Sequence, residues 1–198
     1  GYNKSFNGRF LLFGFIGLLI PWHKFSTSKI VMSSVPLLLI LSIGSTARSL
    51  DWRNGLTLYG HDIEFEPNSY DIQNNYGVEL FRSGQPAEAL SHFIRSTELA
   101  PHWTINWNNL GATLEKFGRF KEAEIAYCRS INNGIYYLAF ENYAYLLART
   151  NQFARALGFT EQIGLVGLPL NPKLLELQKN LSAQNINADE VRFPLECK

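Results

Sequence analysis

The sequence predicts an all-α protein, with an N-terminal transmembrane helical hairpin, then a solenoid of stacked helical hairpins, and last a capping helix. Two uncharged apolar stretches lie within residues 1–50 of the 198, a 34-residue period follows, and a leucine-rich segment comes after the last period. Residues 1–50 hold five cations and no acid, whereas the remainder has 13 basic and 17 acidic residues. The net charge of +1 gives no indication of a nucleic-acid partner.

Residues 10–22 and 30–47 are the two predicted transmembrane helices. The first has 13 uncharged residues and the second 18, and cationic residues flank both. A membrane-spanning helix needs about 20 apolar residues, so the first must extend through its flanking side chains. A secretory signal and a buried soluble helix pair are the alternatives. We expect an integral membrane protein in contact with lipid, whose flanking charges leave its orientation open.

A repeat dominates the rest of the sequence. The segment NNYG at 74–77 recurs as NNLG at 108–111 and as ENYA at 141–144, at spacings of 34 and 33 residues. The small fourth residue suits close helix crossings, and Gly84, Gly118 and Asn151 suit left-handed helix ends. These features are typical of the tetratricopeptide repeat (TPR), a helical hairpin of 34 residues. We expect three repeats in 69–168, with helix pairs at the following ranges: 70–82/86–99, 104–116/120–131 and 137–149/153–163.

The two ends of the solenoid have their own signals. Aligning Pro67 with Pro101 makes 48–68 a juxtamembrane half repeat that consists of a single helix. Residues 169–198 hold a capping helix at about 171–184, followed by a tail. The last hairpin of a solenoid needs such a cap because its outer face is apolar.

One column of the repeat predicts a peptide-binding site. Asn75, Asn109 and Asn142 share a position on the first helix of each hairpin, which lines the concave groove of a TPR superhelix. A carboxamide both donates and accepts hydrogen bonds, so such a ladder suits the backbone of an extended peptide. The alternative is that these residues serve local packing.

A second column is cationic, with Arg82, Lys116 and Arg149 at the same spacings. Three cations along a groove suit acidic segments or a carboxylate terminus. The alternative is simpler, because cations near the end of a helix complement its dipole.

We find no catalytic constellation, cofactor motif or metal-ligand spacing. The four histidines lie far apart, and no glycine-rich phosphate loop occurs. The two cysteines are consistent with one distant bridge, but Cys128 falls within a predicted helix, where a buried free thiol is commoner. We therefore predict that Cys128 and Cys197 form no disulfide.

The junction between the apolar segment and the repeats resembles a known family. It reads Ala47-Arg48-Ser49-Leu50-Asp51-Trp52-Arg53-Asn54, followed by Leu56, Tyr59 and Pro67. This is similar to the C-terminal end of TPR-containing, multi-pass glycosyltransferases of the protein O-mannosyltransferase type. The resemblance implies a polyprenyl-phosphate sugar donor and TPRs on the non-cytoplasmic side. No residue here matches that family's catalytic motifs. The asparagine ladder is similar to one in the intracellular O-GlcNAc transferase, where it holds substrate polypeptide.

The resulting hypothesis is a membrane-anchored TPR module that binds proteins or peptides and is the C-terminal fragment of a larger protein. Its site residues are Asn75, Asn109, Asn142, Arg82, Lys116 and Arg149, with no cofactor. The first alternative is the substrate-recruiting part of a lipid-linked-sugar glycosyltransferase. The second is a complete, small anchored adaptor.

Overall fold

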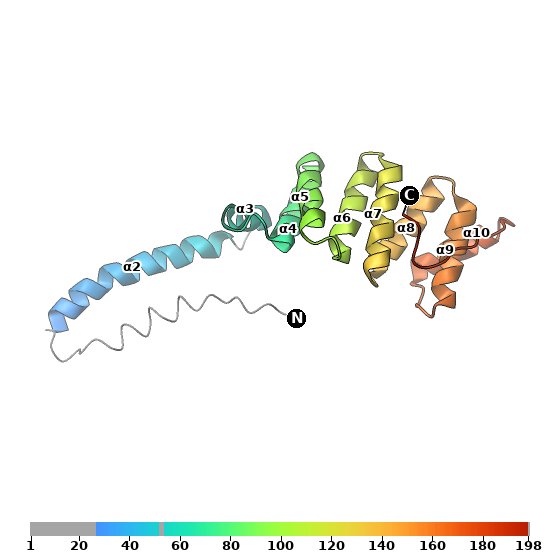
Figure 1. The fold of residues 1–198 in the computed structure, drawn as a ribbon. Coiled ribbons are helices and arrows are strands. Elements are labelled where there is room, and N and C mark those ends of the chain that lie inside the picture. Colours follow the sequence, from blue (N-terminus) through green and yellow to red (C-terminus); the bar gives the residue numbers. More distant parts are fainter. Residues whose placement is uncertain (1–26, 52–53, 198) are drawn as a thin grey trace. The chain divides into compact units, whose positions relative to one another are not determined.

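The computed structural model describes residues 27–51 and 54–197, and all regular secondary structure in these ranges is α-helical. The chain divides into two compact units, Gly1–Leu50 and Asp51–Lys198, which we describe separately. Figure 1 shows the helices in chain order. An all-α fold with repeat-like packing was predicted, and this part of the prediction is confirmed.

The first unit contains most of helix α2 (Thr27–Asp51), which has Pro36 in its interior. Among the described residues, no helix combines the length and the apolar character that crossing a membrane requires. The predicted transmembrane hairpin and integral membrane localisation are therefore wrong. They rested on the absence of charge, but seven of the 18 residues of 30–47 are Ser, Thr, Gly or Pro. The predicted helix at 10–22 lies outside the described residues.

Three helical hairpins form the body of the second unit, and each packs against the next. The hairpins are α4 (Tyr70–Arg82) with α5 (Pro86–Leu99), α6 (Thr104–Lys116) with α7 (Phe120–Asn133), and α8 (Tyr137–Arg149) with α9 (Phe153–Leu165). Ala89, Ala123 and Ala156 are fully buried at equivalent positions of the second helices. Their small side chains let the two helices of each hairpin approach closely.

Each first helix ends in the same way. Gly118 has a φ of 71°, and the following N–H of Arg119 donates to the carbonyl of Leu114 at 3.0 Å. Asn151 takes the same role in the third hairpin with a φ of 60°, and Gln152 N–H donates to Leu147 at 2.8 Å. Asparagine tolerates this left-handed conformation better than most residues, as the sequence predicted.

Serine hydroxyls join the two helices of the first two hairpins. Ser96 Oγ donates to the carbonyl of Tyr70 at 2.8 Å, and Ser130 Oγ, 34 residues later, donates to that of Thr104 at 2.7 Å. Both serines are fully buried. The third hairpin has Ile163 at the corresponding position, and its core is accordingly more apolar.

Shorter helices cover the two ends of the array. Helix α3 (Gly55–Phe65) packs against α4, and the side chain of its N-cap Asn54 accepts from Leu56 N–H. Helix α10 (Pro172–Ser182) packs against α8 and α9, with Asn171 as its N-cap. Leu174 and Leu181 of α10 are buried, as expected for a helix that covers an apolar end face.

After α10 the chain turns back along the solenoid towards α7, as the dark red trace in Figure 1 shows. A disulfide joins Cys197 of this tail to Cys128 of α7. The prediction of no disulfide is therefore wrong. A position in a helix does not prevent a cysteine from bonding, and only the return of the tail brings the second sulfur within reach.

Candidate functional site

Two adjoining hollows lie along α4, α6 and α8, the first helices of the hairpins. Both are lined by Phe81, Ala112 and Asn142, so together they make one surface, which we call the A-helix groove. Of the six predicted site residues, Asn109, Asn142, Arg82, Lys116 and Arg149 line it. Asn75 lines neither hollow.

The first hollow is lined by both apolar and polar side chains. It has a volume of about 270 Å³. Val78, Phe81 and Leu138 contribute apolar side chains, and Asn108, Asn109 and Asn142 contribute carboxamides. Leu138 is 44% exposed, although leucine is usually buried. This arrangement suits one apolar side chain of a ligand beside its own backbone.

The carboxamides form a continuous chain of hydrogen bonds across the three hairpins. Asn142 Nδ2 donates to Asn108 Oδ1 at 2.9 Å, and Asn108 Nδ2 donates to Asn109 Oδ1 at 3.4 Å. Asn109 Nδ2 then donates to Asn74 Oδ1 at 2.9 Å, and Asn74 Nδ2 to Asn75 Oδ1 at 3.3 Å. The predicted ladder therefore alternates with its neighbours Asn74 and Asn108, both of which are buried.

This row of hydrogen-bonded carboxamides joins the hairpins and still leaves some of its donors and acceptors without a partner among the described residues. A carboxamide has two N–H donors and an oxygen with two lone pairs. Each internal link of the chain occupies one donor and one lone pair, so Asn109 and Asn142 each keep a second N–H. Both residues are only partly buried.

The second hollow is polar and has a volume of about 430 Å³. Glu115, one of its lining residues, accepts a hydrogen bond from Tyr127 Oη at 3.0 Å and forms an ion pair with Arg149. Burial, and next the charge of Glu115, raise the pKa of Tyr127 well above its usual value. The phenol therefore stays a donor and holds the carboxylate in place.

The cations of the predicted column differ in their partners. Arg82 pairs with Glu79 of its own helix at 2.9 Å, and Arg149 pairs with Glu115 of the neighbouring hairpin. Lys116 is exposed and has no ion pair with any described residue. Hence, unlike Arg82 and Arg149, Lys116 contributes to the groove a positive charge that is not paired with any described carboxylate.

Sequence reasoning missed two features of this groove. The first is Leu138, an apolar residue in the first turn of α8 that lines the first hollow and lies outside the two predicted columns. The contact between Tyr127 and Glu115 joins residues of two helices, and no spacing rule indicates it.

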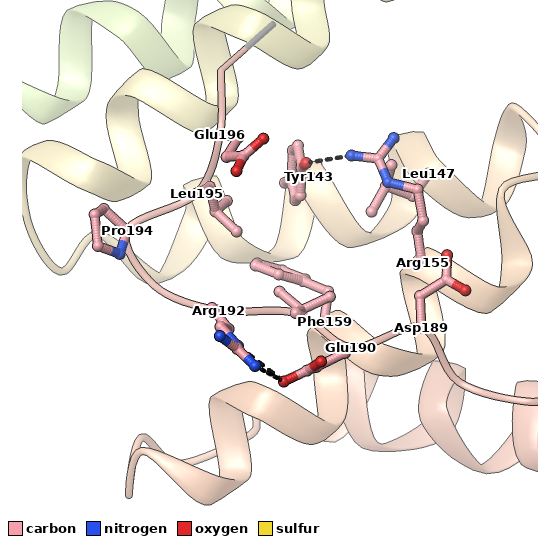
Figure 2. A pocket seen from close by; sticks show the side chains of 11 residues that line it. Tyr143, Leu147, Arg155, Phe159, Asp189, Glu190, Arg192, Pro194, Leu195 and Glu196 are labelled. Carbon is pink, nitrogen blue, oxygen red and sulfur yellow. Dashed lines mark hydrogen bonds and ion pairs between the residues drawn. The ribbon is translucent and has the colours of Figure 1, made fainter.

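A separate cavity of about 560 Å³ lies between the C-terminal tail and helices α8 and α9. Figure 2 shows Phe159 and Leu195 at this cavity, with Arg155 next to Tyr143. Arg155 donates to Tyr143 Oη at 3.1 Å and pairs with Glu124 at 2.8 Å. Burial raises the pKa of Tyr143 to about 12, although nearby Arg155 acts in the opposite direction. Within the described residues, no cluster of His, Cys, Asp and Glu is suited to a metal ion.

The fold and its similarities support a protein-binding module of the TPR type. No protein-family model matches the chain. Among curated proteins, the chain is 27% identical over 111 residues to "Protein O-mannosyl-transferase Tmtc3" of Drosophila melanogaster, covering 56% of this chain and 12% of that protein. The human "Protein O-mannosyl-transferase TMTC3" is 28% identical over 111 residues, covering 54% and 12%.

A third relative has a different name. The chain is 28% identical over 76 residues to "Protein STIP1 homolog" of Dictyostelium discoideum, covering 38% of this chain and 14% of that protein. The chain thus spans between 12% and 14% of the length of these three relatives.

Proposed function

We propose that the A-helix groove binds an extended peptide segment of a partner protein. The observation that supports this most is the row of carboxamides, which retains hydrogen-bonding capacity, lines the first hollow and reaches the polar second hollow through Asn142. The carboxamides of Asn109 and Asn142 bind the peptide backbone. The apolar hollow takes one side chain, and Lys116 attracts an acidic group of the same segment.

The test begins with a random library of nine-residue peptides displayed on phage and selected on the full chain. Selected peptides are synthesised with a fluorophore, and their affinities are measured by fluorescence anisotropy. We expect Asn109→Ala combined with Asn142→Ala to weaken binding at least about tenfold, because hydrogen bonds at a desolvated site are lost. The matched control is Asn180→Ala, an exposed asparagine of α10.

A second variant guards against a general loss of structure, because Asn109 and Asn142 also join the hairpins. Lys116→Glu changes an exposed side chain that makes no ion pair with a described residue. It should weaken the binding of acidic peptides while the circular dichroism spectrum stays the same. Unchanged affinity in both the double asparagine variant and Lys116→Glu would contradict the proposal.

A second candidate function follows from the two O-mannosyl-transferases among the relatives. In this proposal the chain is the substrate-recruiting part of a protein glycosyltransferase that uses a polyprenyl-phosphate sugar and whose catalytic region lies elsewhere. The groove then holds the acceptor protein. The test is to sequence the genomic DNA upstream of the codon for Gly1. A reading frame that continues into a glycosyltransferase region supports it, and a stop codon directly upstream contradicts it.

A further inference from the structure

The C-terminal tail lies on the solenoid as an extended peptide. Its residues alternate between partly buried and exposed positions. Such an alternation is expected of an extended strand, in which every second side chain points to the same face. The partly buried residues are Val191, Phe193, Leu195 and Cys197, and the exposed residues between them are Arg192, Pro194 and Glu196. One face of the tail therefore packs against α7, α8 and α9, and the other faces outward.

Helices α7 and α9 bind the backbone of the tail. Asn132 Oδ1 accepts from Leu195 N–H at 2.7 Å, and Asn132 Nδ2 donates to the carbonyl of Leu195 at 2.8 Å. One carboxamide thus pairs with both polar backbone groups of one residue. Nearer the start of the tail, Asp189 N–H donates to the carbonyl of Ala154 in α9 at 3.0 Å.

The side chains of the tail fit an apolar site. The Phe193 ring lies with its centroid 6.1 Å from that of Phe140 and 5.9 Å from that of Phe159, in edge-to-face contact with both. Such pairs are favourable beyond the area they bury.

Gly158 of α9 makes room for the backbone of the tail. A Cβ at this position would lie only 1.9 Å from the carbonyl oxygen of Asp189. Gly158 therefore allows a close contact with the tail that a larger residue would block.

The tail does not fill the space around it. The cavity of about 560 Å³ lies on one side, and one of about 370 Å³ lies beside Phe193 and Pro194, lined also by Ile131, Phe140 and Leu168. Neither shares a lining residue with the A-helix groove. The surface formed by α7, α8 and α9 under the tail, which we call the tail channel, can therefore hold larger side chains than those of the tail.

We propose that the tail channel is a second peptide-binding site, that segment 189–197 occupies it in cis, and that reduction of the Cys128–Cys197 disulfide opens it to a peptide in trans. The ligand is an extended segment with bulky apolar residues at alternate positions. Its backbone takes the place of Leu195 at Asn132.

The opening step is thiol–disulfide exchange with a dithiol. A thiolate of the dithiol attacks one sulfur of the disulfide, forms a mixed disulfide and expels the other cysteine as a thiolate. The second thiol of the reductant then displaces the remaining cysteine. The dithiol becomes a disulfide, and Cys128 and Cys197 become thiols. The tail is then held by non-covalent contacts alone, at a high effective concentration that an incoming peptide must overcome.

The experiment uses the full chain and a fluorescent synthetic peptide with the sequence of residues 188–196, ADEVRFPLE. Its affinity is measured by anisotropy for the oxidised protein, for the protein reduced with dithiothreitol, and for the variant Cys197→Ser with Phe193→Ala. The variant should bind at least about tenfold more tightly than the oxidised protein, because its own tail has lost the disulfide and its main aromatic contact. The reduced protein should lie between the two.

Two substitutions in the opened variant locate the peptide. Gly158→Ala and Asn132→Ala should each weaken binding about tenfold, whereas their controls should not. The controls are Gly164→Ala, where a Cβ meets no atom within 4 Å, and Asn180→Ala. Equal binding by oxidised and opened protein, no binding by either, or unchanged binding by Gly158→Ala would each overturn the proposal. Lys116→Glu should leave this binding unchanged, so the two proposed sites succeed or fail separately.

Discussion

At the residue scale, two helical glycines that look alike in the sequence have different roles. A Cβ at Gly111 would lie 2.7 Å from the Tyr127 ring, whereas one at Gly164 would meet nothing within 4 Å. Gly111 is buried where α6 crosses α7. The hydroxyl of Tyr127 also donates a hydrogen bond to Glu115. A side chain at Gly111 would therefore disturb both the core and the groove.

We predict that Gly111→Ala lowers the free energy of unfolding by about 1–3 kcal/mol, as expected for overpacking in a closely packed core. Gly164→Ala should raise it by up to about 1 kcal/mol, because alanine is the better helix former. Urea denaturation followed by circular dichroism measures both. Equal effects of the two substitutions would show that the close contact at Gly111 is unimportant.

His92 gives the fold a dependence on pH. Burial lowers its pKa, opposed by the charge of Glu88, and its ring lies against Tyr76 with Nδ1 2.8 Å from Gln73 Oε1. The unfolded chain therefore binds the proton more readily than the folded one. Stability is retained above the unfolded pKa of about 6.5 and lost as the pH falls below it.

We accordingly expect a lower urea midpoint at pH 5.5 than at pH 7.5. His92→Gln should reduce this difference, and His102→Gln, at an exposed position, should leave it as it is. If the His92 variant kept the full pH dependence, the origin would lie in other groups.

The sequence predicted which residues line the groove better than it predicted how they are bonded. The columns of Asn109 and Asn142, and of Lys116 and Arg149, follow from the period because equivalent positions of a repeat face the same way. The partners do not follow from it. Whether Arg149 meets Glu115, or Asn142 meets Asn108, depends on distances between hairpins that the spacing of the repeat does not contain.

At the scale of elements, the bounds of the repeat helices were the most predictable feature. Three signals coincide at each first helix, namely a small residue at the crossing, an apolar period and a left-handed residue at the end. For α2 the prediction rested on one stretch of 18 uncharged residues with cationic flanks, and no repeat supported it. The error there shows that the length and lack of charge of one segment are a poorer guide than signals that recur in three repeats.

Helix α10 offers a comparison of two adjacent leucines. Leu174 is 2% exposed against the last hairpin, and Leu175 is 56% exposed. We predict that Leu174→Ala lowers the free energy of unfolding by about 2–5 kcal/mol, and that Leu175→Ala changes it by less than about 0.5 kcal/mol. Urea denaturation compares them. Equal effects would contradict the role of α10 as a cap.

At the scale of the whole molecule, the path of the tail was the least predictable feature. Cys128 and Cys197 are separated by 69 residues, and nothing between them specifies that the chain returns to α7. The alternation of Val191, Phe193 and Leu195 indicates an extended segment with one buried face. It does not say which helices the segment meets. That depends on Gly158 and Asn132, which look unremarkable in the sequence.

The similarities also belong to this scale. The matched part of the human relative covers 54% of this chain but 12% of that protein. A repeat that recurs in proteins with such different names as an O-mannosyl-transferase and a STIP1 homolog indicates a shared binding scaffold more than a shared reaction.

The carboxamide chain has a further consequence, because every amide in it points the same way. The Asn142 oxygen accepts no hydrogen bond from a described residue, and at the opposite end the Asn75 amino group donates none to one. The row of carboxamides therefore ends in a hydrogen-bond acceptor on α8 and in a hydrogen-bond donor on α4. If the proposed peptide binds along this row, we expect its N-to-C direction to matter, so that a sequence and its reversal bind with unequal strength.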